Sequence, residues 1–99
     1  MNPELAIRLT MRKESEGGRN APFATGYCPH LVTTGSSEWL GVRVSASLGP
    51  VAPGETADVR VELLYHREVD YSVLSPGARF QLMEGPRVVG EGTVLAVCS

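Results

Sequence analysis

Apolar and polar residues alternate with a period of two along most of the chain, which is the pattern of half-buried β-strands. The clearest runs are residues 5–12 and 56–65. One face of these two runs carries Leu5, Ile7, Leu9, Met11, Ala57, Val59, Val61 and Leu63. Weaker patterns predict further strands over residues 31–34, 39–48, 78–83 and 88–97. We therefore expect a β-sheet protein with six short strands.

Two stretches refine this picture. In residues 39–48, every second side chain from Val42 to Leu48 is expected to face the core, which includes Ala46. Leu64 and Tyr65 break the alternation at the end of their run, which predicts burial on both sides there.

The strands are expected to close on one another. No segment has helical spacing over ten residues. Gly90 and Gly92 lie inside the last run, which predicts a β-bulge or a tight barrel bend. Several antiparallel strands in 99 residues form a sandwich or a small barrel, and closure removes exposed edges. We predict an all-β fold, a six-stranded antiparallel β-barrel, with residues 1–99 as a single domain.

A long connection, residues 16–30, separates the first two runs. Its glycines and prolines are residues that strand interiors avoid. Loops of this length are usually functional or disordered. Phe23 and Tyr27 supply apolar mass to bury, and Pro22 and Pro29 stiffen the backbone. We therefore expect an ordered loop that is pinned to the β core.

Charge and composition restrict the class of function. The net charge is −2, with nine basic and eleven acidic residues, so a general electrostatic grip on nucleic acid is not expected. The first twenty residues are too charged for a secretory signal, and no run approaches the roughly twenty apolar residues of a membrane span. Cys28 and Cys98 are expected to be free thiols. These features predict a cytoplasmic protein that is not membrane-bound.

Five short segments, taken in order, are similar to one known domain. They are Glu16-Gly17-Gly18-Arg19-x-x-Pro22-Phe23-x-x-Gly26-Tyr27-x-Pro29, Pro53-Gly54, His66, Gly77-x-Arg79-Phe80 and Glu84-Gly85-x-Arg87-x-Val89-Gly90-x-Gly92-x-Val94. The chain resembles the C-terminal domain (domain III) of elongation factor Tu over roughly residues 6–97. The resemblance implies a stand-alone copy of that six-stranded antiparallel β-barrel.

The resemblance also implies a function. In the family, this domain packs on a GTPase domain, contacts the T-stem of aminoacyl-tRNA and meets the nucleotide exchange factor. The chain has no Gly-x4-Gly-Lys segment, and Lys13 is its one lysine, so we expect no GTP binding, no cofactor and no enzymatic activity. We expect a non-catalytic binding module for an unidentified protein partner, related to translation or its regulation. The alternative is a tRNA- or RNA-binding domain, although Cys28 replaces an arginine of the family's Tyr-Arg-Pro-Gln segment.

The predicted binding residues lie in the long loop and in the turn of residues 84–87. They are Arg19, Phe23, Tyr27, His30, Glu84 and Arg87. Arg19 could contact a phosphate or a partner, or tie the loop to carbonyls or a carboxylate. Phe23 and Tyr27 could form an exposed patch or plug the loop onto the barrel. Glu84 and Arg87 could form a simple ion pair across their turn.

Other chemistry has weaker support. Cys28, Cys98, His30 and His66 are the only cysteines and histidines, and they form no Cys-x-x-Cys pair, so no metal site is predicted. Cys28 and His30 share a strand face as a nucleophile and base would, but the sequence supplies no orienting group for them.

Trp39 is expected in the core or at the barrel rim, with an interface anchor as the alternative. The Trp39 region and any barrel edge could support a homo-oligomer. No residue requires one.

Overall fold

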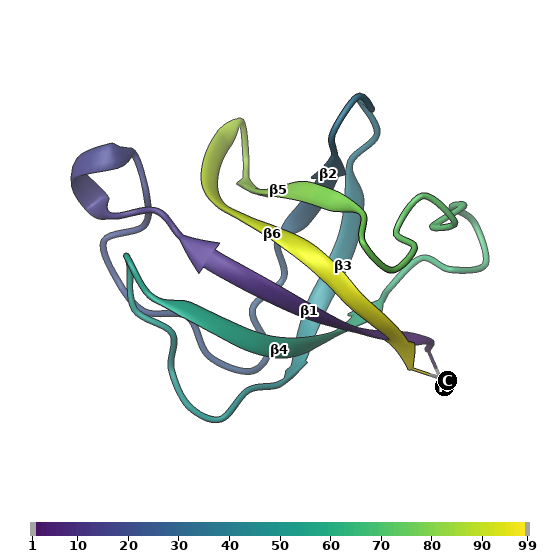
Figure 1. Ribbon diagram of the computed structural model, residues 1–99, viewed down its shortest axis with the longest axis horizontal. Coiled ribbons are helices and arrows are strands. Elements are labelled where there is room, and N and C mark those ends of the chain that lie inside the picture. The colour runs from purple at the N-terminus through teal and green to yellow at the C-terminus, as the bar shows by residue number, and fades with distance from the viewer. Residues whose placement is uncertain (1, 99) are drawn as a thin grey trace.

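The computed structural model describes residues 2–98, which form six strands and one short 3₁₀ helix (Figure 1). The elements are β1 (Glu4–Met11), η1 (Glu14–Glu16), β2 (His30–Thr33), β3 (Leu40–Ala46), β4 (Thr56–Leu63), β5 (Arg79–Glu84) and β6 (Arg87–Cys98). All neighbouring strands are antiparallel, and they close in the order β1-β4-β3-β2-β5-β6. The predicted all-β fold, a six-stranded antiparallel barrel, is confirmed.

The barrel core is built from the alternating faces that the sequence pattern identified. β1 pairs with β4 so that Ile7 lies opposite Val59 and Leu5 lies opposite Val61, and all four side chains are buried. Phe80 and Leu82 of β5 are also buried. Burial of each such side chain stabilises the fold by about 1.5–3 kcal/mol. The paired strands are therefore held by apolar contacts as well as by hydrogen bonds.

The predicted inward positions of Ala46 and Leu48 are wrong. The register between β3 and β4 shifts between Val44 and Ala46, which inserts an extra residue into β3. A shift of one residue moves the following side chains to the other face of a strand. Ala46 is consequently exposed, and Leu48, beyond the end of β3, is fully exposed.

The predicted burial of Leu64 and Tyr65 is also wrong. β4 ends at Leu63, and the next residues turn sharply, with the Tyr65 carbonyl accepting hydrogen bonds from the amides of Glu68 (2.9 Å) and Val69 (2.8 Å). Leu64 is partly exposed, and Tyr65 is half-exposed. The break in alternation marked the end of a strand rather than a strand buried on both faces.

The bulge predicted in the last strand is present. The register between β5 and β6 shifts next to Gly90, and the register between β1 and β6 shifts between Ala6 and Ile7. Gly92 sits where β6 is squeezed between β1 and β5. A Cβ atom at this position would lie 2.7 Å from Cζ of Phe80 and still closer to the carbonyl oxygen of Arg8. Only glycine fits this approach.

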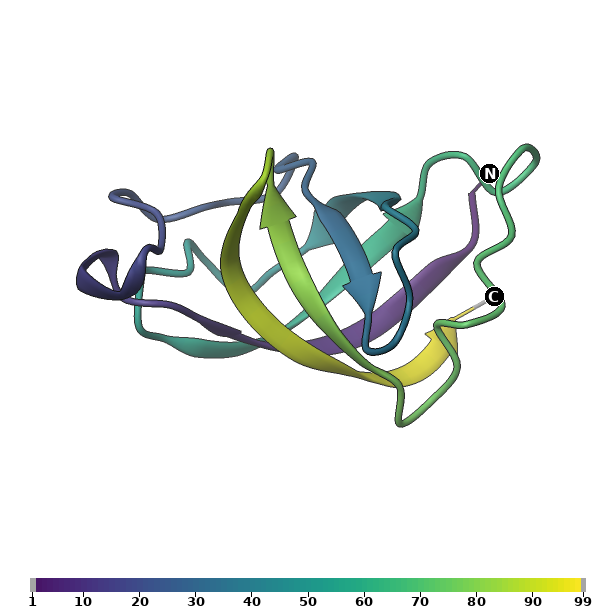
Figure 2. The same cartoon turned by 90° about the horizontal axis from the view of Figure 1, so that it is seen from above.

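The long loop of residues 16–30 is ordered, as expected, and lies at one end of the barrel (Figure 2). Phe23 forms an isolated bridge with Val51, through amide–carbonyl hydrogen bonds of 3.0 and 2.9 Å. Farther along, the Gly26 amide donates to the carbonyl of Val44 (2.8 Å), and the Val44 amide donates to the carbonyl of Tyr27 (2.8 Å). The loop thus continues the pairing of β2 along β3. Figure 2 places the connection between β4 and β5 at the opposite end, near both termini.

In the part of the chain that the structure describes, residues 2–98, no helix has the length and apolar character needed to cross a membrane.

Candidate functional site

The Glu84 carboxylate joins the long loop to the β5–β6 turn. Its Oε2 accepts a hydrogen bond from the Tyr27 hydroxyl (2.6 Å) and another from the Arg19 guanidinium. Its Oε1 lies 3.6 Å from Nη2 of Arg87, which is the ion pair expected across the turn. Arg19 also donates to the carbonyl of Ala21 (3.2 Å), and its guanidinium lies 4.5 Å from the centre of the Tyr27 ring. We call Arg19, Phe23, Tyr27, Glu84 and Arg87 the loop anchor.

Aromatic packing completes the loop anchor. Phe23 is buried in the barrel core and stacks on Tyr27, with ring centroids 5.0 Å apart. Tyr27 is partly buried over it, so that its ring separates Phe23 from solvent while its hydroxyl reaches Glu84. In this arrangement the two rings plug the loop onto the barrel, and Arg19 ties the loop to a carboxylate and a carbonyl. Five of the six predicted binding residues are therefore brought together, with most of their polar groups already bonded.

The environment of the loop anchor shifts the protonation of its members. Burial raises the pKa of the Tyr27 hydroxyl, and its hydrogen bond to Glu84 raises it further. Partial burial alone would raise the pKa of the Glu84 carboxyl. Hydrogen bonds from Tyr27 and Arg19 and the charges of Arg19 and Arg87 outweigh it, so this pKa lies below its ordinary value. At neutral pH, the polar members of the loop anchor are thus a neutral tyrosine, a carboxylate and two arginines.

The lowered pKa of Glu84 predicts how the loop anchor responds to acid. A carboxyl whose pKa is lower in the folded state stabilises the fold above its unfolded-state pKa, and this contribution is lost as the pH falls through the folded-state pKa. We expect wild type to be more stable than Glu84→Gln at pH 7 and the difference to disappear below the folded-state pKa of Glu84. Urea denaturation of both proteins between pH 7 and pH 3 measures it. A difference that does not change with pH would contradict the role of the Glu84 charge.

His30, the sixth predicted residue, belongs to a different surface. It opens β2, where it lies opposite Gly41 of β3 and Met83 of β5. Its ring meets Trp39 edge-on, with centroids 5.8 Å apart. The Tyr65 ring covers Gly41, because a Cβ atom there would lie 2.7 Å from Cε2 of Tyr65 and 3.7 Å from Nε2 of His30. We call His30, Trp39 and Tyr65 the aromatic patch.

The aromatic patch is exposed and fixed in place. Trp39 is 46% exposed and Tyr65 is 51% exposed. The buried Tyr71 hydroxyl donates to the carbonyl of Gly41 (2.7 Å) and accepts from the amide of Tyr65 (3.1 Å), so it fastens the turn after β4 to β3. The sequence predicts Trp39 in the core or at the barrel rim, and its 46% exposure places it at the rim, which leaves the alternative of an interface anchor open. The exposed position of Tyr65 could not be predicted, because the break in alternation shows where β4 ends but not how the following turn directs the Tyr65 side chain.

A polar groove crosses the outside of β1, β5 and β6. It has a volume of about 580 Å³, and its walls include Thr10, Arg12, Thr34, Arg79, Gln81 and Thr93. Arg12 is already bonded to Glu91, at 2.9 and 3.1 Å. Arg79 has no carboxylate within ion-pair distance in residues 2–98. The groove therefore presents one available guanidinium among several hydroxyl groups.

The cysteines and histidines are dispersed. Cys28 is exposed, and its thiol lies 3.3 Å from the carbonyl of Gly26. Within residues 2–98, no three histidine, cysteine or carboxylate side chains are placed to hold a metal ion.

No protein-family model matches the chain. The resemblance to the C-terminal domain of elongation factor Tu therefore stays a prediction, and the functional surfaces are assigned from geometry. The loop anchor is bonded within the chain, whereas the aromatic patch is open to a partner.

Proposed function

We propose that the protein is a non-catalytic binding module of the cytoplasm, of the kind found in the C-terminal domain of elongation factor Tu, and that it binds a protein partner through the aromatic patch. The strongest support is that Trp39 and Tyr65 are both about half exposed and that both lie near His30. Tryptophan and tyrosine are enriched among the few residues that carry most of the energy of an interface. Their rings present large apolar faces and lose little side-chain freedom on binding.

The chemistry around the aromatic patch favours an arginine-bearing segment of the partner. Glu38 is exposed beside Trp39, and Glu68 is exposed in the turn after β4, where its amide donates to the Tyr65 carbonyl (2.9 Å). The whole chain is also acidic, with a net charge of −2. A guanidinium stacks on tryptophan and tyrosine faces and is attracted by carboxylates nearby. By the resemblance, the partner belongs to the translation apparatus or normally binds the elongation factor.

The loop anchor has a supporting role in this proposal. It holds the loop that leads directly into His30, the first residue of β2. Because its polar groups bond one another, the loop needs no partner to order it. The aromatic patch is therefore formed before binding, which reduces the conformational entropy lost on association.

The proposal is tested by capture from cytosol with wild type, the Trp39→Ala, Tyr65→Ala double variant and Val73→Ala as a control on another exposed apolar residue. The captured protein is then purified and titrated against each form by calorimetry, because the double variant lacks the only tryptophan and gives no Trp39 emission. We expect the double variant to bind at least about 30-fold more weakly, as for the loss of ~2 kcal/mol at an interface centre. Equal capture and affinity in all three forms would refute the aromatic patch as the binding surface.

The second candidate, an RNA-binding domain, is favoured by the available guanidinium of Arg79 in the polar groove. Arginine and hydroxyl groups are typical contacts of a phosphate backbone. RNA binding would weaken steeply as salt rises and would be lost in Arg79→Glu, while the charge-matched Arg67→Glu would retain it. Salt-insensitive capture of a protein would instead favour the aromatic patch.

A further inference from the structure

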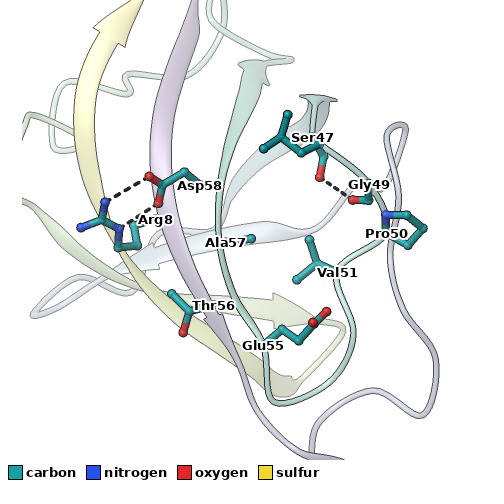
Figure 3. Close-up of a pocket in the computed structure, with 10 residues that line it drawn as sticks. Arg8, Ser47, Gly49, Pro50, Val51, Glu55, Thr56, Ala57 and Asp58 are labelled. Carbon is teal, nitrogen blue, oxygen red and sulfur yellow. Dashed lines mark hydrogen bonds and ion pairs between the residues drawn. The ribbon is translucent and has the colours of Figure 1, made fainter.

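The outer face of the barrel around Leu48 combines a projecting leucine with a hollow on each side of it. Leu48 is as exposed as in an extended peptide. One hollow, of about 370 Å³, is lined by Ala6, Ala46, Val59, Arg60 and Leu95. The other, of about 520 Å³, runs past Gly49, Pro50, Val51, Thr56 and Ala57 (Figure 3). Ser47, Leu48 and Asp58 border both hollows.

Two irregularities of pairing make this face apolar. The register shift in β3 turns Ala46 outward, and the shift between β1 and β6 leaves Leu95 without an opposite residue. Leu95 is 39% exposed. Ala6 and Ala46 both lie opposite Arg60 of β4, so two small side chains flank that strand and form the floor of the first hollow. The face therefore has a projecting side chain, Leu48, which we call the knob. It also has a hollow beside Leu95, lined by small residues, that can receive such a side chain.

The two charged groups at the smaller hollow, Asp58 and Arg60, are already paired, whereas Glu55 at the larger hollow accepts only a hydrogen bond from the Ala52 amide (2.7 Å). Arg8 donates two hydrogen bonds to the Asp58 carboxylate, at 2.8 and 3.0 Å, as Figure 3 shows. Arg60 lies 3.8 Å from the Glu4 carboxylate. A strongly charged partner would find no unpaired charge in the smaller hollow, which is the one that receives the leucine in the arrangement below. An equally apolar surface with balanced charges would meet no repulsion.

We propose that the occupant of this face is a second copy of the same chain. In a twofold dimer, the contact surface must be complementary to itself, because each protomer presents the same patch. Leu48 of each protomer would enter the hollow between Leu95 and Ala46 of its partner. Two of the exposed large apolar side chains in residues 2–98, Leu48 and Leu95, lie at this face, and the dimer would remove both from water.

The inference is independent of the proposed function. The barrel order places β1, β4 and β6 at the Leu48 face, whereas His30 pairs with residues of β3 and β5. Leu48 and Trp39 lie beyond opposite ends of β3. A dimer formed through Leu48 would therefore leave the aromatic patch free for a partner.

Sedimentation equilibrium between about 1 µM and 1 mM tests the dimer. We expect wild type to shift with concentration from its 10.6 kDa protomer to twice that mass. Leu48→Glu is expected to weaken association at least 100-fold, while Val73→Glu, which adds the same charge at another exposed apolar residue, is expected to leave it unchanged. Circular dichroism checks that all three forms are folded.

Knob and hollow can also be tested separately. Leu48→Ala removes the knob, and Ala46→Glu fills the hollow, so each variant alone loses both contacts of the twofold dimer. A mixture retains one intact contact, with Leu48 of the Ala46→Glu chain in the open hollow of the Leu48→Ala chain. We expect native mass spectrometry to find mixed dimers in at least tenfold excess over either pure dimer.

Three results of the sedimentation experiment would each overturn the proposal. They are a wild type that stays a protomer at 1 mM, a Leu48→Glu form that still dimerises, and a Val73→Glu form that dissociates as readily as Leu48→Glu.

Discussion

Replacing Gly92 with alanine is expected to lower the free energy of unfolding by about 3 kcal/mol, the upper part of the range for overfilling a packed site. The added Cβ would collide with the carbonyl oxygen of Arg8 and with Cζ of Phe80, at 2.7 Å. One of these atoms belongs to the backbone of β1, and the other to a ring packed in the core. Neither can move without separating paired strands.

Gly49→Ala is the matched control for this prediction. No atom lies within 4 Å of a Cβ at Gly49, and its backbone is outside the left-handed region. Alanine there is expected to be neutral or to stabilise by up to about 1 kcal/mol, because it restricts the unfolded chain. Urea denaturation of both variants measures the contrast. A loss below about 1 kcal/mol in Gly92→Ala would mean that β1 and β6 can separate at little cost.

The fold could be predicted where the sequence pattern and the strand geometry agree. β1 and β4 alternate without interruption, and Leu5 and Val61 face the core as the period of two requires. The failures at Ala46 and Leu48 have one cause, the bulge in β3. No glycine or proline marks this bulge in the sequence, and its position depends on how β4 pairs with it. An alternation pattern cannot detect such a shift.

The candidate site was predictable as a set of residues but not in its bonding. The sequence predicts Arg19, Tyr27 and Glu84 as members of one binding surface, and the structure brings them into hydrogen-bond contact, with Arg19 and Glu84 separated by 65 positions of sequence. Such polar groups can either bond one another or face a partner. The outcome depends on the distances between side chains of the long loop and of the β5–β6 turn, which are known only from the folded chain. The aromatic patch was less predictable, because it needs the turn after β4 to fold Tyr65 back over Gly41.

Replacing Phe23 with alanine is expected to lower the free energy of unfolding by about 3–5 kcal/mol, as for other buried phenylalanines. This full loss is expected if the loop stays packed on the barrel and unfolds only together with it. Phe23 is 2% exposed, and Tyr27 stacks directly on its ring. The loop can also detach locally, which would limit the loss in global stability. Phe23→Leu, which retains much of the apolar volume, is expected to lose less than half as much.

Amide hydrogen exchange separates these two responses to Phe23→Ala. The amides of Gly26 and Val51 bond across the loop, at 2.8 and 2.9 Å, whereas the amides of Ile7 and Val59 report on the closed barrel. Local detachment would accelerate exchange at Gly26 and Val51 while the β1–β4 ladder stays protected. Global destabilisation would lower the free energy of opening by the same amount for both groups of amides, so that both would exchange faster. If exchange changes in neither group and the free energy of unfolding falls by less than about 1 kcal/mol, the stacked rings of Phe23 and Tyr27 do not hold the loop. Glu84 and its hydrogen-bond donors must then hold the loop alone.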